Sequence, residues 1–143
     1  MFLLDANVLI YAFRRDLPEH RRAKQWLEEN LVGTASGGML PFTELAFLRI
    51  TTNARVFGEP CLLDEAVHFL DDLRSSSILT EVQPGPEHRS IFIRLAREHG
   101  LTGEHLTDAF VAAAAIESAA TLVSADRGFR HFRGLRWTDP LDP

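Results

Sequence analysis

Short apolar runs alternate along the chain with segments in which apolar residues recur every three or four positions. The uniform runs predict buried strands, the stronger at residues 2–4 and 120–126 and the weaker at residues 77–82 and 135–137. The helical spacing predicts helices over residues 6–13, 18–31, 39–53, 64–74, 87–99 and 106–119, with residues 33–38 as a loop or weak strand. Strands that alternate with helices indicate an α/β fold in one domain, residues 1–143, with a mostly parallel central sheet and helices on both faces.

Residues that start or stop helices stand where the periodic segments begin and end. Asp16 and Pro18 mark the start of the second helix, and Pro41 stands in the first turn of the third. Gly100 is placed to end the helix over residues 87–99 in a left-handed conformation. The local chemistry therefore agrees with the boundaries that the apolar spacing predicts.

Four acidic residues stand where strands end or helices begin. Asp5 follows the first strand directly, Asp126 follows the strand near residues 121–124, and Glu44 and Asp108 fall in the first turns of their helices. Each has a structural explanation on its own, because an acid in a first helical turn interacts favourably with the helix dipole and can cap free N–H groups. In an open parallel sheet, however, ligands bind beyond the carboxyl ends of the strands. We therefore expect the four carboxylates to meet at one edge.

Carboxylates gathered at one edge repel one another and raise one another's pKa values. This clustering brings no advantage to residues that act only as helix caps. A divalent cation would remove this conflict. Oxygen ligands without a supporting histidine or cysteine cluster favour Mg²⁺ or Mn²⁺ over zinc. Such ions activate water and neutralise charge on a phosphodiester, so the predicted chemistry is metal-assisted phosphodiester hydrolysis.

Four segments in order along the chain resemble the successive motifs of the PIN-domain family, and most closely those of VapC-type ribonuclease toxins of bacterial VapBC toxin–antitoxin pairs. The segments are LLDANVLIYA (3–12), FTELAFLRITTN (42–53), LTDAFVAAAAIE (106–117) and TLVSADRGFRHF (121–132), followed by GLRWTDP near the end of the chain. The resemblance implies that Asp5, Glu44, Asp108 and Asp126 are the catalytic, metal-binding acids of an endoribonuclease that uses Mg²⁺, with Mn²⁺ as an alternative. It also implies an RNA substrate, often transfer or ribosomal RNA, a homodimer, and inhibition by a small VapB-type antitoxin in a hetero-oligomeric complex.

Three polar residues stand within two positions of these acids and are candidates to support them. Asn7 is expected to orient an acid or hold a metal-bound water, unless it only bonds within its own turn. Ser124 is expected to bond a carboxylate or cap a turn, and Thr107 to serve as a helix-start hydroxyl or as part of the site. His105 precedes Asp108 by three residues, although a lone histidine is more often simply hydrogen-bonded or exposed.

The charge of the chain limits how it can meet RNA. The net charge is −5, which argues against attraction of nucleic acid to the whole surface. Of the 15 basic residues 14 are arginine, whose planar guanidinium suits phosphate groups, although a genome rich in G and C explains the same bias. Arg127 and Arg130 are therefore candidates for contacts with RNA or an acidic antitoxin residue, and Arg14 and Arg15 are weaker ones.

The remaining composition sets the expected compartment. No stretch of about 18 apolar residues is present, so we expect no membrane span. Cys61 is the only cysteine, which excludes a disulfide framework and fits a reducing cytoplasm. Glu117 lies nine residues after Asp108, too far along the same helix to join the acids, and is expected on the surface.

Three other functions compete with the ribonuclease toxin. A phosphatase of the haloacid-dehalogenase kind also has an Asp after its first strand, but it needs a second Asp two positions later, where this chain has Asn7. A non-catalytic PIN-like module that binds RNA or a partner is disfavoured because all four acids are in place. A PIN nuclease that processes RNA without a toxin role stays open, and the presence of a small antitoxin gene next to this one would distinguish it.

Overall fold

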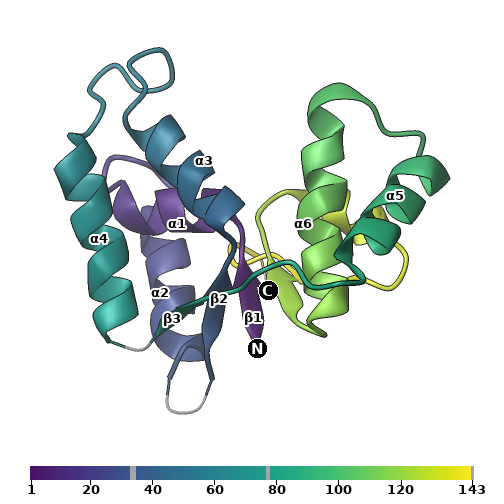
Figure 1. Ribbon diagram of the computed structural model, residues 1–143. Coiled ribbons are helices and arrows are strands. Elements are labelled where there is room, and N and C mark those ends of the chain that lie inside the picture. Colours follow the sequence, from purple (N-terminus) through teal and green to yellow (C-terminus); the bar gives the residue numbers. More distant parts are fainter. Residues whose placement is uncertain (33–34, 77, 143) are drawn as a thin grey trace.

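A parallel sheet forms the centre of the computed structural model, which describes residues 1–32, 35–76 and 78–142 (Figure 1). Over these residues the strand order is β3-β2-β1-β4-β5, and every neighbouring pair is parallel. The strands are β1 (Phe2–Leu4), β2 (Gly37–Met39), β3 (Leu79–Glu81), β4 (Thr121–Val123) and β5 (Arg136–Thr138). The order places the two strongest predicted strands, β1 and β4, side by side at the centre.

Helices cover both faces of this sheet, as the alternating pattern predicts. The helices are α1 (Ala6–Phe13), α2 (His20–Asn30), α3 (Pro41–Thr51), α4 (Leu63–Ser75), α5 (His88–Glu98) and α6 (Leu106–Glu117), with short 3-10 helices η1 (Gly103–His105) and η2 (Arg127–His131). Figure 1 shows α1 to α4 on one side of the sheet and α5 and α6 on the other.

Two hydrophobic cores follow from the alternation of side chains along the central strands. Leu4 and Val123 point into the core beneath α1 to α4, whereas Leu3 and Leu122 point into the core beneath α5 and α6. All four are almost fully buried, which is why these strands read as uninterrupted apolar runs. The second core is built largely from the alanines of α6, whose small side chains let that helix lie close to the sheet.

The observed elements lie within about two residues of the predicted ones at most boundaries. The predicted helix over residues 18–31 begins only at His20, and the helix over residues 87–99 ends at Glu98. Gly100 has the predicted left-handed conformation, with φ of +59°. Of the predicted strand at residues 77–82, Ser77 lies outside the described residues, as do residues 33–34 of the loop before β2. None of the helices in the described ranges is both long enough and apolar enough to cross a bilayer.

Strand β2 corrects the predicted helix over residues 39–53. Met39 belongs to the strand, and α3 begins only at Pro41. Glycine in a sequence predicts neither a strand nor a helix, but close packing around β2 requires glycine at residues 37 and 38. A Cβ on Gly38 would lie 2.5 Å from Cγ2 of Val82, and one on Gly37 would lie 3.2 Å from the carbonyl oxygen of Ile78.

Candidate active site at the carboxyl ends of β1 and β4

Asp5 caps α1 immediately after β1, and its carboxylate accepts three hydrogen bonds. Its backbone N–H donates to the carbonyl of Val123 over 3.0 Å, which ties the end of β1 to the end of β4. Its Oδ1 accepts from the N–H of Ala6 at 2.7 Å, and its Oδ2 accepts from Asn7 at 3.0 Å and from Ser124 at 2.6 Å. The polar interruption after the first strand is therefore a helix cap and a member of the candidate site at once.

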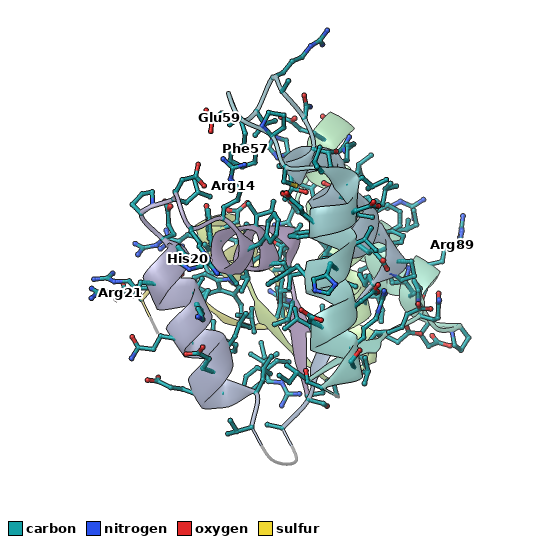
Figure 2. All side chains as sticks on the ribbon, turned by 90° about the vertical axis from the view of Figure 1, so that its left-hand side faces the viewer. Arg14, His20, Arg21, Phe57, Glu59 and Arg89 are labelled. Atoms are coloured by element: carbon teal, nitrogen blue, oxygen red, sulfur yellow. The ribbon has the colours of Figure 1, made fainter. Side chains whose placement is uncertain are left out.

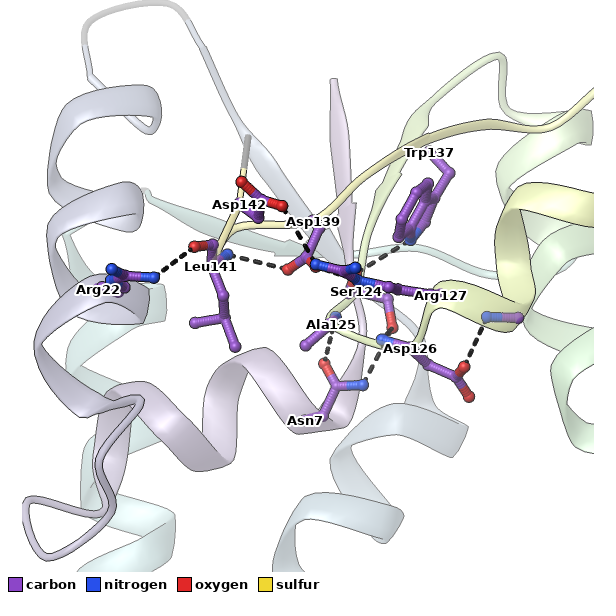
Figure 3. Close-up of polar contacts among 11 residues, drawn as sticks. Asn7, Arg22, Ser124, Ala125, Asp126, Arg127, Trp137, Asp139, Leu141 and Asp142 are labelled. Carbon is purple, nitrogen blue, oxygen red and sulfur yellow. Dashed lines mark hydrogen bonds and ion pairs between the residues drawn. The ribbon is translucent and has the colours of Figure 1, made fainter.

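Ser124 joins the two strand ends through one buried hydroxyl. The residue is fully buried, and its Oγ donates to Asp5 while it accepts from the Asn7 amide at 3.0 Å and from the N–H of Asp126 at 3.1 Å. Asn7 completes the connection because its Oδ1 accepts from the N–H of Ala125 at 3.2 Å (Figure 3). The structure thus brings Asn7 and Ser124 to Asp5, and the amide of Asn7 is fully engaged in orienting the two loops.

The burial of Asp5 has an electrostatic consequence. Removal from water raises the pKa of its carboxyl above the ordinary 3.8, and the charge of Asp126 raises it further. The hydrogen bonds from Ser124, Ala6 and Asn7 act in the opposite direction because they stabilise the ionised form, but burial has the larger effect.

Asp108 and Asp126 face the same edge from the other half of the molecule. Asp126 is exposed and caps η2, where its Oδ1 accepts from the N–H of Gly128 at 2.8 Å. Asp108 lies in the first turn of α6, and its pKa is raised by burial and then by the charges of Asp126 and Asp5. His105, with Nδ1 at 3.8 Å from Asp108, partly offsets this shift. We call Asp5, Asp108 and Asp126 the acid cluster, because each interacts electrostatically with another of the three.

Glu44, the fourth predicted acid, is engaged elsewhere. Arg74 of α4 donates from both terminal nitrogens to its two carboxylate oxygens, at 3.1 and 2.5 Å. Both side chains are about two-thirds buried, with exposed fractions of 28% for Glu44 and 32% for Arg74. Sequence spacing gives no sign of this pair, which joins residues 30 positions apart. Among the described residues, no group of three or more His, Cys, Asp or Glu side chains is arranged so that it could hold a metal ion without a change in position.

The other predicted supporting residues are placed away from the acids or are occupied. Thr107 donates to the carbonyl of Glu104 at 2.6 Å, the role of a helix-start hydroxyl. Arg127 forms ion pairs with Asp139 at 3.5 Å and Asp142 at 3.1 Å, which anchor the C-terminal segment (Figure 3). These ion pairs could not be predicted from the sequence, because Asp139 and Asp142 lie 12 and 15 residues after Arg127 and no local pattern links them.

Three further residues from the sequence predictions make contacts within the protein. The guanidinium of Arg14 lies over the ring of Phe57 and bonds Asp16 and the carbonyl of Glu59, so it is tied to the protein (Figure 2). Arg130 is exposed, with Nε at 3.4 Å from Nε2 of His131. The carboxylate of Glu117, expected only to lie on the surface, accepts from the N–H groups of residues 85 and 87 and holds the loop before α5.

The family model of the PIN domain matches residues 2–135 of this chain. The chain belongs to the PIN-domain family. Among curated relatives of this PIN domain, VapC ribonuclease Mb2897 of Mycobacterium bovis is 42% identical, over 99% of this chain and 97% of the relative. Ribonuclease VapC33 of Mycobacterium tuberculosis is 34% identical over 99% of both chains.

Solved structures agree on the fold of this PIN domain. One is VapBC2 from Rickettsia felis bound to a promoter DNA fragment, with a TM-score of 0.71, 16% identity, and coverage of 96% of this chain and 97% of the other. Another is VapBC-1 from Haemophilus influenzae, with a TM-score of 0.68, 14% identity and 97% coverage of both. The predicted family and fold are confirmed.

Proposed function

We propose that this PIN domain is a divalent-metal-dependent endoribonuclease and the toxin of a type II toxin–antitoxin pair. The observation that carries the proposal is the acid cluster at the carboxyl ends of the central strands, in a chain 42% identical to a VapC ribonuclease. Burial and mutual repulsion raise the pKa values of Asp5 and Asp108, and a cation bound to their oxygens would offset both effects because it favours the ionised carboxylates.

The donor set fits a hard divalent ion such as Mg²⁺ or Mn²⁺ because it consists of carboxylate oxygens. Asp5, Asp108 and Asp126 would hold it, and Glu44 would join them when it leaves Arg74. A bound ion of this kind lowers the pKa of water and neutralises the charge that develops on a phosphodiester. Ser124 fixes the orientation of Asp5 in this arrangement, because its hydroxyl bonds the carboxylate at 2.6 Å.

The proposed partners are RNA, such as transfer or ribosomal RNA, a second copy of the chain and a VapB-type antitoxin, all in the cytoplasm. The support for an antitoxin is that the structural neighbours include VapBC complexes. The net charge of −5 makes a bound cation important for RNA as well, since the acids alone repel phosphate.

Cleavage of purified RNA tests the enzymatic part of this proposal. We expect cleavage with Mg²⁺ or Mn²⁺, none in excess EDTA, and recovery when Mn²⁺ is added back. Asp5→Asn and Asp108→Asn should abolish cleavage, whereas Asp64→Asn, in the exposed first turn of α4, should cleave like the wild type. Full activity of Asp108→Asn, or cleavage that survives EDTA, would contradict the metal site.

Induction of the gene in a bacterial host tests the toxin role separately. We expect growth arrest that the small neighbouring reading frame relieves when it is expressed together with this chain. Cleavage in vitro without growth arrest would favour an RNA-processing nuclease. Binding of RNA without cleavage would favour a non-catalytic module.

A further inference from the structure

Two adjoining hollows lead away from the acid cluster along the end of α5 and the segment that contains η2. The first, of about 310 Å³, reaches Asp108 and Gly128, and the second, of about 360 Å³, reaches Arg133. His99 and His131 line both hollows, so the two adjoin and together make a path from Asp108 to Arg133. We call this path the histidine groove.

The wall between the two hollows is suited to flat aromatic groups. His99 packs edge-on against Phe132, with ring centroids 4.9 Å apart, and Phe132 is only 8% exposed and therefore supports it from below. His99 and His131 are themselves exposed, so a ligand in the groove can reach their side chains. Proteins that recognise unpaired RNA stack splayed bases on rings of this kind.

The far end of the groove carries available positive charge. Arg133 is exposed, and no ion pair within 4 Å involves it among residues 1–32, 35–76 and 78–142. Glu98, the acid on this wall, pairs with Arg94 at 3.3 Å, which offsets its charge. Arg14 and Arg127, by contrast, are occupied by neighbouring carboxylates. A phosphate group that reaches this end therefore meets a guanidinium that no carboxylate within the described part of the chain neutralises.

We propose that the histidine groove is a subsite for single-stranded RNA, which seats an unpaired base against His99 and His131 and the following phosphate at Arg133. This proposal rests on the ribonuclease function proposed above, and it gives the direction in which the substrate leaves the acids. Because an unpaired base must enter the first hollow, the groove favours single strands over duplexes.

Binding of a fluorescently labelled single-stranded RNA in EDTA, where the wild type does not cut, tests the groove. We expect His131→Ala to weaken binding at least about 5-fold, the lower end of what one base-stacking contact contributes. Arg133→Ala should weaken it and also reduce the slope of log affinity against log salt by about 0.7, the value for one phosphate contact with a single strand. A duplex of the same sequence should compete poorly with the single strand.

Matched controls are available on other surfaces of the molecule. His68→Ala, on the exposed side of α4, and Arg89→Ala, at the start of α5, should leave binding unchanged. All four substituted side chains are exposed, and equal melting temperatures will show that the variants fold. With Mn²⁺ present, the two groove variants should raise KM and leave kcat close to that of the wild type, because neither side chain belongs to the acid cluster.

The outcomes separate the groove from the nuclease. If the wild type cleaves RNA and both groove variants bind and cleave like it, the groove is wrong and the nuclease stands. If the groove variants lose binding while Asp108→Asn still cleaves, the metal site is wrong and the groove stands. A wild type that neither binds nor cleaves RNA overturns both.

Discussion

Replacement of Ser124 by alanine tests the central connection of the site, because one buried hydroxyl holds both strand ends. The substitution removes the bond donated to the Asp5 carboxylate at 2.6 Å. It also removes the acceptor for the N–H of Asp126 at 3.1 Å and for one N–H of Asn7 at 3.0 Å. The methyl group that remains fits the space but satisfies none of these partners.

The magnitude follows from these three bonds. A hydrogen bond to a charged group contributes about 1.5–3 kcal/mol, and a buried donor left without a partner costs about 1–3 kcal/mol. Since Asp126 is exposed, water replaces part of what its N–H loses. We therefore expect Ser124→Ala to lower the free energy of unfolding by about 2–4 kcal/mol, which corresponds to roughly 6–14 °C in melting temperature for a domain of this size. Loss of the donated bond should also raise the pKa of Asp5 further.

Urea unfolding at pH 7 in EDTA measures this effect without any contribution from bound metal. Ser118→Ala is the matched control, because its hydroxyl donates only to the carbonyls of its own helix end, at 2.7 Å to Ala114. The control should change stability by no more than about 0.5 kcal/mol. A Ser124→Ala variant as stable as this control would refute the view that the hydroxyl holds the two loops together.

Three other substitutions have expected outcomes that follow from the structure. In EDTA, Asp108→Asn should have a higher free energy of unfolding than the wild type at pH 7, and urea unfolding should show this difference shrink toward pH 4. Burial and the other acids raise the pKa of Asp108, so the wild type loses the stability of the neutral carboxyl as pH rises, whereas the asparagine variant does not. Arg74→Gln should tighten Mn²⁺ binding measured by calorimetry, because it removes the ion pair that competes with the cation for Glu44. In a Glu44→Gln background, where that pair is already lost, the same substitution should have a much smaller effect. An added Cβ meets nothing within 4 Å at either Gly100 or Gly58, but only Gly100 of the two has a positive φ. Gly100→Ala should therefore cost about 1–2 kcal/mol in thermal unfolding, and Gly58→Ala should cost less.

The parts of the fold that could be predicted are those encoded within a few neighbouring residues. Apolar spacing and local start and stop residues placed the helices, and Gly100 adopts the left-handed conformation expected of it. The positions of Asp5 and Asp126 at one edge follow from a general property of parallel sheets, so two uniform apolar runs were enough to bring them together.

The parts that could not be predicted depend on residues far apart in the chain. Strand β2 carries two glycines because Val82 and other neighbours approach them closely, and no local pattern records that approach. The pair of Glu44 with Arg74 joins two helices, and each residue alone resembles an ordinary helix-end charge. The indole N–H of Trp137 bonds the carbonyl of Ser124 at 3.0 Å, which connects the edge strand β5 to the site in a way that spacing does not reveal.

The four proposed metal ligands divide into two kinds by how they are held. Asp5 and Asp126 follow the central strands, and Ser124 bonds the carboxylate of the first and the backbone of the second, so the same contacts that join β1 to β4 also fix these acids. Glu44 and Asp108 project from the first turns of helices on opposite faces of the sheet, where Arg74 pairs with the first carboxylate and His105 lies 3.8 Å from the second. The strand acids are therefore set by folding, whereas the proposed ion would have to replace Arg74 at Glu44 and displace the ring of His105 from Asp108. Because the proposed ion would have to displace these side chains, we infer that the two helix acids would control the affinity for metal, and that substitutions at Ser124 act on stability more than those at Arg74.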